Sequence, residues 1–392
     1  MEQPSIVFAT HISYLDGAME HIKLASTQFT NFNVVITLAP KQLFKNIIDL
    51  RHVNLKNYPA IVDFNEIKVE WKLELLEPYF EHCKTVNFLI FQEESLKRAF
   101  FVTRKFNAHI RHLKPQFIHF DSYINRQIVQ LPFLFANRRK IILNVHDAKP
   151  HTGEEDSIST FIERCLYRWC SKFVTFSEFS KKLLQERLRS KKEVVSSCLL
   201  PFSFYRNYMN GASPHGRTNT ISFVGRVSKY KGIDLFIEAI NIVHKTLPDI
   251  EFVIAGKSFG GYVPDFQKVQ NKDRLTIVQR HLSNSELVEI ILGSHLIVCP
   301  YLDASQSGVV MTAIALDRPV LVTTAGGLKE YITDGKNGMV CEIDKNDLAL
   351  KVIGFSSQGL FKQMTETIGS DLYKKELETR YRQVLVEKVY NN

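Results

Sequence analysis

Short apolar runs alternate with segments of helical length along almost the whole chain, and this alternation limits the fold most strongly. Strands that alternate with helices form βαβ units around a mostly parallel sheet. The sequence therefore predicts an α/β fold with two doubly wound, Rossmann-like domains. The predicted strands are Ser5–Thr10, Asn33–Thr37, Phe117–Phe120, Lys140–Val145, Phe173–Phe176, Thr220–Val224, Glu251–Ala255, Thr276–Val278, Leu296–Cys299 and Val320–Val322, the last of which is expected to complete the second sheet.

The stretch from Pro201 to Thr218 lacks periodicity and is rich in Asn, Ser, Gly and Pro, which is typical of a linker. We therefore predict one domain over residues 1–205 and another over residues 206–370. A last helix, from about Asp371 to Val389, is expected to pack back on the first domain. Open α/β sheets bind ligands at the carboxyl ends of their strands, so two such domains should enclose a binding cleft.

The composition is that of an ordinary globular protein, with 45% apolar and 23% charged residues among 392. The six cysteines form no Cys-x-x-Cys pair and mostly lie in apolar runs, so we predict buried free thiols in a reducing compartment. The sequence shows neither a signal-peptide pattern nor an apolar run of about 18 residues. We expect a cytoplasmic protein or one held on the inner face of a membrane.

Basic residues are concentrated in the first half of the chain. Between Lys97 and Lys149 there are eleven Lys and Arg residues against two acids, an excess equal to the whole formal charge of +9. Cations between residues 97 and 114 interleave with large apolar side chains, which is an amphipathic pattern. A solvated face over a buried one explains it, and so does docking on an anionic membrane surface. Nucleic acid is disfavoured as a partner, because no recognised binding module is present.

The segment from Pro300 to Glu330 predicts an anion site. A strand ends at Pro300, small residues form a turn at 304–308, and a helix follows from about Val309 to Leu316. The first backbone N–H groups of a helix have no partner within it, and the helix dipole favours negative charge there. The turn therefore suits a diphosphate.

A second loop, from Gly225 to Gly232, follows a predicted strand and carries Arg226 and Lys231. Arg binds phosphate oxygens as a fork, and Lys adds a mobile point charge. The loop lacks the Walker spacing, and an exposed basic loop with no ligand is the plainer interpretation.

Together the two loops resemble the donor domain of family 4 glycosyltransferases, which have the two-domain GT-B fold. The resemblance is strong over residues 218–345 and weak in the first half. The matching motifs, in the expected order, are Val224-Gly225-Arg226, Lys231-Gly232, Ala255-Gly256, Pro300, Gln306-Ser307-Gly308-Val309, Pro319-Val320, Gly326-Gly327-x-x-Glu330 and Asp334-Gly335-x-Asn337-Gly338.

The resemblance implies transfer of a sugar from a nucleotide diphosphate sugar to a glycan or lipid-linked saccharide, with retention at the anomeric carbon. It implies an acceptor-binding first domain, a donor-binding second domain and a role in polysaccharide or cell-envelope synthesis. Catalytic roles fall to His146, Arg226 and Lys231. Donor contacts fall to Gly17, Gly225, Arg226, Lys231, Arg280, Gln306, Ser307, Gly308, Val309 and Thr312. We expect no metal or other cofactor, because the sequence has no Asp-x-Asp triplet and no His/Cys cluster with metal spacing.

The chain departs from its apparent family at one point. Many members carry two glutamates eight residues apart where this chain has Ala304 and Thr312, although a branch with a Gln-Ser-Gly-Val turn is more similar. Thr312 is then either a ribose contact or only a helix residue. Glu330 is either a ligand contact or the N-terminal cap of a helix.

Three residues of the first half, His146, Gly17 and Ser177, keep two interpretations each. His146 ends a strand and either faces the ligand or is satisfied by a main-chain group, and His151 is a weaker candidate. Gly17 either allows a ligand to approach the backbone or lies in a plain turn. Ser177 is expected first as a helix N-cap and second as an acceptor or phosphate contact.

Two other functions stay open at this point. One is a nucleotide-sugar epimerase or hydrolase on the same fold, which needs carboxylates that converge in the cleft. The other is a non-catalytic scaffold subunit, which the missing glutamate pair leaves open. Nucleotide diphosphate binding distinguishes the scaffold from the enzymes.

Overall fold

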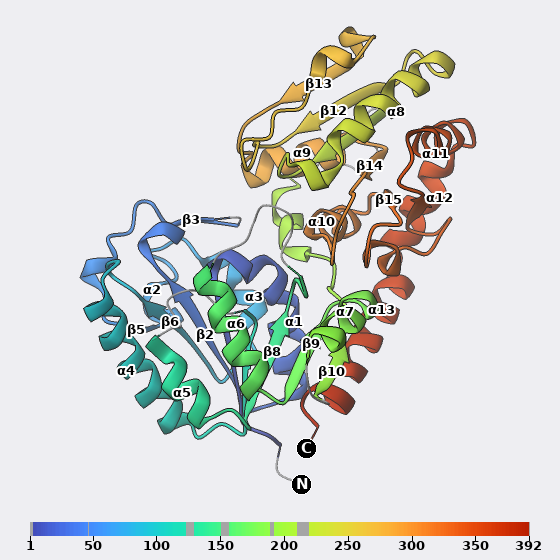
Figure 1. Ribbon diagram of the computed structural model, residues 1–392. Helices are drawn as coiled ribbons and strands as arrows, with labels where there is room; N and C mark the ends of the chain where they lie inside the picture. The colour runs from blue at the N-terminus through green and yellow to red at the C-terminus, as the bar shows by residue number, and fades with distance from the viewer. Residues whose placement is uncertain are drawn as a thin grey trace.

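A computed structural model of the protein describes residues 3–45, 47–122, 129–149, 157–188, 192–209 and 219–391. These residues form two α/β domains that lie one above the other in Figure 1, with helices on both faces of each sheet. The predicted fold of two Rossmann-like domains is confirmed.

The N-terminal sheet has eight strands in the order β10-β9-β8-β7-β1-β2-β6-β5. All neighbours run parallel except β5, which pairs antiparallel with β6. The strands are β1 (Ile6–His11), β2 (Phe32–Leu38), β5 (Ile61–Asp63), β6 (Thr85–Ile90), β7 (Phe117–Phe120), β8 (Ile141–Val145), β9 (Lys172–Thr175) and β10 (Glu193–Ser196). Its central strands β1 and β7 are almost entirely buried, as expected for a sheet covered on both faces.

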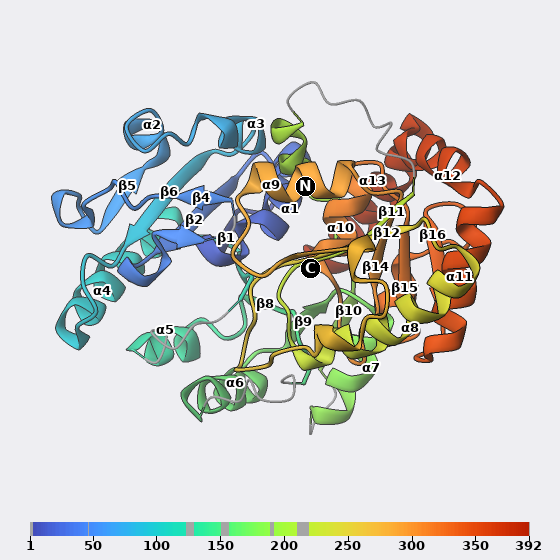
Figure 2. The same ribbon diagram turned by 90° about the horizontal axis from the view of Figure 1, so that it is seen from above.

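Helices cover the two faces of this sheet in separate sets. Figures 1 and 2 show α4 (Leu96–Leu113), α5 (Leu131–Ala136) and α6 (Ser157–Trp169) together on one face. Helices α1 (Leu15–Gln28), α2 (Phe64–Ile67) and α3 (Glu77–Phe80) lie on the other. A short hairpin of β3 (Phe44–Lys45) and β4 (Ile48–Asp49) stands apart from the sheet.

The C-terminal sheet has six parallel strands in the order β13-β12-β11-β14-β15-β16. The strands are β11 (Thr220–Val224), β12 (Glu251–Ala255), β13 (Leu275–Val278), β14 (Leu296–Cys299), β15 (Val320–Thr323) and β16 (Gly338–Cys341). Its helices are α8 (Ile233–Thr246), α9 (Asn284–Leu292), α10 (Gly308–Ala315), α11 (Lys345–Ser357) and α12 (Leu360–Gly369).

Most predicted strands are confirmed within one residue at each end, but the second sheet does not finish at β15. The strand β16 pairs with β15 at the edge, from Val320 opposite Gly338 to Thr323 opposite Cys341. Its sequence, Gly-Met-Val-Cys, begins with a glycine and is only four residues long, so it gives a weak strand signal. Likewise, no strand was predicted for β3, β4, β5, β6 or β10.

The chain passes between the domains after β10. The predicted linker contains a 3-10 helix, Ser203–Tyr208, and its residues 210–218 lie outside the described part of the chain. The Ser203 hydroxyl contacts Tyr79 of the N-terminal domain at 2.8 Å, whereas the Arg206 guanidinium bonds Asp317 of the C-terminal domain. Contacts therefore change from one domain to the other within three residues.

The last helix crosses back along the N-terminal domain (Figure 1). It runs as α13 (Asp371–Val384) and continues in a π-helical turn, Leu385–Val389. The hydroxyls of Tyr381 and Tyr390 bond to His21 of α1 at 2.7 and 3.1 Å. The C-terminal segment is thus part of the N-terminal domain's packing.

All six cysteines are free thiols. Three are buried, Cys170, Cys299 and Cys341, and the other three are half-buried, Cys83, Cys165 and Cys198. The prediction of free thiols is therefore confirmed, and the prediction of burial holds for half of them.

Candidate functional site

Two close backbone contacts hold the predicted donor loops together. A Cβ atom added to Gly232 would lie 1.8 Å from the carbonyl oxygen of Pro300, and Gly232 has a φ of +70°. A Cβ added to Gly225 (φ +113°) would lie 3.1 Å from the Val309 side chain. Both positions favour glycine for conformation and for space. The loop after β11 therefore packs directly against the turn that starts α10.

The start of α10 is an ordered N-terminus that faces this loop. Ser307 is the N-cap, and its hydroxyl accepts a hydrogen bond from the Val310 amide. The Met311 amide donates to the Ser307 carbonyl. The amides of Gly308 and Val309 come before the Met311 amide, the first to donate to a carbonyl of the helix, so they have no partner within it. They are the donors that the sequence predicted for an anion.

The two cations of the loop differ in their surroundings. Lys231 is half-buried, and its nitrogen lies 3.6 Å from the centroid of the Tyr301 ring. Arg226 is exposed and stacks on the Phe259 ring at 5.0 Å. Lys231 thus rests on a buried ring, whereas Arg226 stacks on a ring that is itself exposed.

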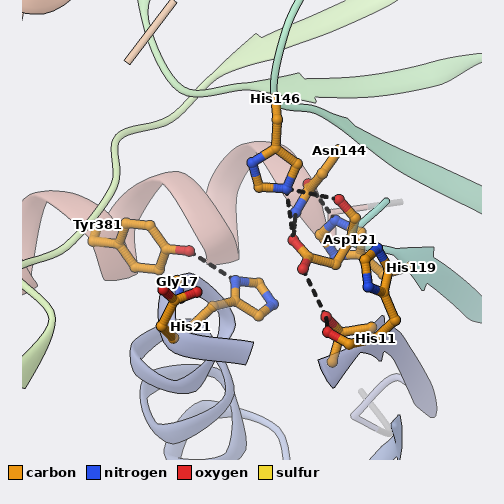
Figure 3. A network of polar contacts seen from close by, with 10 residues as sticks. His11, Gly17, His21, His119, Asp121, Asn144, His146 and Tyr381 are labelled. Carbon is orange, nitrogen blue, oxygen red and sulfur yellow. Dashed lines mark hydrogen bonds and ion pairs between the residues drawn. The ribbon is translucent and has the colours of Figure 1, made fainter. Parts of the chain in front are cut away.

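On the N-terminal side, His146 follows β8 and bonds to Asp121, which follows β7 (Figure 3). Its Nε2 lies 2.9 Å from the Asp121 carbonyl oxygen and 3.2 Å from Oδ1. Burial opposes charge on both groups, but their hydrogen bonds and mutual attraction outweigh it. The pKa of Asp121 is therefore held below its usual range, and the pKa of His146 is raised.

Tyr14 packs beside His146. Its ring centroid lies 4.7 Å from that of His146. The side chain is 37% exposed as a whole. The pKa of its phenol is raised to about 12, first by desolvation and then by Asp147 and other carboxylates, and the positive charge of Arg226 opposes this shift.

Phe202 is a buried ring that packs between the starts of α1 and α10. A Cβ added to Gly17, near the start of α1, would lie 3.5 Å from this ring, and one added to Gly308 would lie 3.1 Å from it. The two helix starts therefore meet on opposite sides of one buried phenyl group. Gly17 also lines a small cavity together with His146. A Cβ at Gly17 would make only an ordinary van der Waals contact with the Phe202 ring, so packing does not require glycine here.

Two residues that were predicted to contact the sugar donor form hydrogen bonds within the C-terminal domain. The Thr312 hydroxyl is buried and donates to the Gly308 carbonyl at 2.9 Å, one turn earlier in α10. The Arg280 guanidinium is exposed and pairs with both oxygens of Glu286 on α9. Arg280 shares no contact with Arg226, Lys231 or the 306–309 turn among the described interactions. Donor contact by either residue stays a prediction.

Glu330 acts as a helix cap, but on a helix of the other domain. Its carboxylate accepts hydrogen bonds from the Glu178 and Phe179 amides, at 2.6 and 2.8 Å. These amides begin α7 (Glu178–Arg187) of the N-terminal domain. Ser177 is the N-cap of this helix, as predicted, and its hydroxyl also donates to the Ser305 carbonyl across the domain boundary at 3.2 Å. Of the two interpretations of Glu330, the helix cap is the one that the structure shows, and this cap joins the two domains.

Several residues at the site were not singled out from the sequence. They are Tyr14, His21, Asn144, Phe202, Tyr301, Tyr381 and Tyr390, together with the role of Asp121. His119 and Asn144 are polar side chains inside otherwise apolar strands, and that contrast is a usable signal for a buried polar network. His151 lies outside the described residues.

The described ranges contain no group of three or more His, Cys, Asp or Glu side chains arranged to hold a metal ion. In the same ranges, no helix combines the length and the apolar character needed to cross a bilayer.

The C-terminal domain has a recognisable family signature. Residues 218–357 match the family described as Glycosyl transferases group 1. An uncharacterized glycosyltransferase of Methanocaldococcus jannaschii is 24% identical over 206 residues, which are 52% of this chain and 55% of that protein. A D-inositol 3-phosphate glycosyltransferase of Paenarthrobacter aurescens is 31% identical over 127 residues, 31% of each chain. The chain thus matches about half the length of the first relative and a third of the second.

Solved structures match over the whole chain, at low sequence identity. HepE of Anabaena, in complex with UDP and glucose, has a TM-score of 0.64 at 14% identity and covers 98% of this chain and 99% of its own. A glycosyltransferase of Rickettsia africae has a TM-score of 0.64 at 12% identity, with 100% of both chains covered. A UDP-GlcNAc 2-epimerase of Neisseria meningitidis has a TM-score of 0.58 at 13% identity, covering 99% and 100%. The fold is therefore the GT-B arrangement.

Proposed function

We propose that the protein is a glycosyltransferase that moves a sugar from a nucleotide diphosphate sugar to a hydroxyl of a glycan or lipid-linked saccharide. One observation carries the proposal: the Gly225–Gly232 loop and the 306–309 turn pack together at the start of α10. The match of residues 218–357 to group 1 glycosyltransferases supports it, as does the UDP in the HepE complex.

In the proposed reaction, charge develops on the departing diphosphate. Arg226, Lys231 and the amides of Gly308 and Val309 stabilise that charge, so no metal is needed. A phosphate oxygen takes the proton of the acceptor hydroxyl, and the new bond forms on the face that the leaving group occupied, which retains the anomeric configuration. His146 lies on the opposite wall of the cleft beside the reacting sugar. Its Nε2–H is held by the Asp121 carbonyl, so Nδ1 is the atom left to meet a ligand.

We further propose that the acceptor is met at an anionic membrane surface, through helix α4. On this helix Leu96 is 71%, Phe100 62% and Phe101 44% exposed, beside cations that include Arg98, whose guanidinium stacks on the Phe101 ring at 4.6 Å. Exposed phenylalanines among cations suit the boundary between lipid headgroups and acyl chains. Flotation with phosphatidylglycerol vesicles tests this. Binding at low salt that Phe100→Ser weakens is expected, and absence of binding at any salt contradicts it. A polysaccharide or cell-envelope pathway fits such a surface.

A nucleotide-sugar epimerase is the second candidate, because one such enzyme shares the fold over the whole chain. Two measurements separate the candidates. The first is a thermal-shift screen with nucleotide sugars, since a ligand that binds only the native state raises the melting temperature. The second follows the stabilising sugar nucleotide with and without saccharide acceptors. Acceptor-dependent release of the nucleoside diphosphate supports transfer, and conversion to an isomeric sugar without release supports the epimerase. A protein that no nucleotide diphosphate stabilises is the non-catalytic scaffold.

A further inference from the structure

A continuous chain of buried hydrogen bonds joins His146 to the last residues of the protein. Figure 3 shows most of it, from His146 and Asp121 through Asn144 and His119 toward His21 and Tyr381. Asn144 Nδ2 donates to Asp121 Oδ1 at 2.9 Å, and Asn144 Oδ1 lies 2.6 Å from His119 Nε2. The second half of the chain is formed by two tyrosines of the C-terminal segment.

The Tyr390 hydroxyl bridges two histidines. It lies 2.6 Å from His119 Nδ1 and 3.1 Å from His21 Nε2. The Tyr381 hydroxyl lies 2.7 Å from His21 Nδ1 and ends the chain. Each of these side chains is buried, so an unpaired polar atom here would cost stability.

The donors and acceptors of this hydrogen-bond chain can be assigned in order, beginning from Asp121. Asp121 is ionised, because its pKa lies below the usual range, so its oxygens only accept. They take hydrogen bonds from the Thr10 hydroxyl at 2.8 Å, from the Asn144 amide and from His146. Asn144 must therefore direct its NH₂ group to Asp121 and its oxygen to His119. A reversed amide would set an oxygen against the carboxylate.

The orientation of the Asn144 amide determines where the protons of His119, His21 and the two tyrosines lie. Its oxygen only accepts, so His119 carries its proton on Nε2. Burial lowers the pKa of His119 to about 4 and also holds the pKa of His21 well below its usual value, so both rings are neutral at pH 7. His119 Nδ1 then accepts from the Tyr390 hydroxyl, which accepts in turn from His21 Nε2–H. His21 Nδ1 accepts from the Tyr381 hydroxyl.

We propose that Tyr390 is a positioning residue for His146: by donating to His119 Nδ1, it fixes the His119 proton on Nε2 and thereby keeps Asn144 donating to Asp121. The role assigned to His146 rests on the proposed function, whereas the hydrogen-bond order itself does not. The position of His146 therefore depends on how the C-terminal segment packs against the N-terminal domain.

The loss of the Tyr390 hydroxyl should change His146 in a defined direction. Without that donor, His119 Nδ1 is a buried acceptor with no partner, so the ring and the Asn144 amide bonded to it are held less firmly. Asp121 then keeps its charge with a weaker hydrogen bond from Asn144 and attracts the His146 proton more strongly. The pKa of His146 should therefore rise further.

The first test uses the wild-type protein and ¹H–¹⁵N correlation spectra of its histidine rings. We expect neutral His119 and His21 at pH 7.5, both protonated on Nε2. A proton on Nδ1 of His119, or a doubly protonated ring, overturns the proposal. This test needs no substrate and no variant, so it decides the question even if substituted proteins fail to fold.

The second test compares Tyr390→Phe with Tyr373→Phe. The first variant keeps the ring that packs at 5.1 Å from Phe29 and removes only the hydroxyl. The second removes a hydroxyl of the same C-terminal segment, which bonds to Asn337 at 2.7 Å and lies outside the hydrogen-bond chain. We expect the NMR titration of His146 to move upward in Tyr390→Phe alone, and kcat to fall about threefold to tenfold at unchanged donor KM.

Equal His146 titrations in the two variants overturn the proposal, because a purely structural role would affect only the melting temperature. The outcome is separable from that of the proposed function. If no sugar nucleotide is turned over, the proposed function fails, yet the tautomers and the His146 titration still report on the chain. If transfer is found and the titration does not move, only the positioning role fails.

Discussion

The side-chain nitrogen of Lys231 lies 3.6 Å from the centroid of the Tyr301 ring, so an ammonium group rests on the face of a fully buried phenol. The Tyr301 hydroxyl lies 3.1 Å from the hydroxyl of Ser307, the N-cap of α10. One side chain therefore contacts both halves of the proposed diphosphate site. The Tyr301 side chain therefore fixes the Lys231 ammonium group relative to the start of α10.

Replacement of Lys231 by Ala is expected to weaken donor binding about 10- to 100-fold, the usual effect of losing a charge-assisted hydrogen bond. Lys229→Ala is the matched control, because it removes the same charge from an exposed position in the same loop. Its effect should stay below about threefold, as for other exposed charges. Donor KM and nucleotide affinity measure both. Equal effects of the two variants contradict a specific role for Lys231.

Replacement of Tyr301 by Phe keeps the ring under Lys231 and removes the contact with Ser307. We expect a loss of about 1 kcal/mol in the free energy of unfolding, typical of one neutral hydrogen bond. Donor affinity should change less than in Lys231→Ala, because the ring still holds the ammonium group. Urea unfolding and donor binding, measured on the same variant, check the two effects separately. A loss of affinity as large as that of Lys231→Ala would assign the hydroxyl, and not the ring, the main role.

Replacement of Gly232 by Ala should separate the two donor loops. The added Cβ would lie 1.8 Å from the Pro300 carbonyl, at a φ of +70° that side chains disfavour. We expect a loss of more than about 2 kcal/mol in the free energy of unfolding, together with weaker nucleotide binding. Gly354→Ala is the control, because that glycine lies in α11 with open space around its Cβ position. It should be neutral or slightly stabilising, since Ala favours helices. Equal stability of the two variants would contradict the close approach.

Replacement of Glu330 by Ala removes the cap that joins the domains. The α7 amides of Glu178 and Phe179 lose their carboxylate, so the closed arrangement should be destabilised by about 1 kcal/mol. We expect a larger radius of gyration in small-angle scattering without ligand and a lower kcat. Lys329→Ala, one residue earlier and also exposed, is the control. Scattering curves that are identical for wild type and Glu330→Ala would show that the cap does not stabilise closure.

Stability should fall as the pH is lowered from 6.5 to 4. In the unfolded chain His119 takes up a proton below about 6.5, whereas the folded ring stays neutral down to about 4. The unfolded state then binds more protons, so His119 alone removes about 3 kcal/mol from the free energy of unfolding across this window. His21 acts in the same direction. His146 has a raised pKa, so the stability that it contributes is fully present below pH 6.5 and does not change across this window.

His119→Gln isolates this effect, because an amide keeps one donor and one acceptor but does not titrate. Urea unfolding at several pH values should give a shallower dependence in the variant than in wild type. The same dependence in both proteins would show that His119 is not held neutral. Charged and titratable groups around it are Asp121, His21, Tyr390 and Lys172.

The sequence predicted the sheets and the donor loops well because both are local signals. Strands such as Thr220–Val224 are continuous apolar runs, and Gly225 and Gly232 mark a loop by themselves. The short edge strand β16 was missed because four residues that begin with glycine carry little signal.

The rest of the site depends on contacts between residues far apart in the chain. Glu330 caps a helix more than 150 residues earlier, and Tyr390 meets His119 at a separation of 271 residues. Phe202 lies between two helix starts from different domains. Propensity and spacing describe neighbours in sequence, so these relationships could not be derived from them. His146 was found only because strand ends meet at the cleft.

The central claim is that the Gly225–Gly232 loop and the start of α10 hold a nucleotide diphosphate. Isothermal titration calorimetry of UDP, GDP, ADP and dTDP into wild type and Arg226→Ala tests it most directly. We predict that at least one nucleotide binds wild type and that the variant binds it about 10-fold or more weakly, because a charge-assisted phosphate contact is lost. No binding of any of the four to wild type, or equal affinity in the variant, would contradict the account.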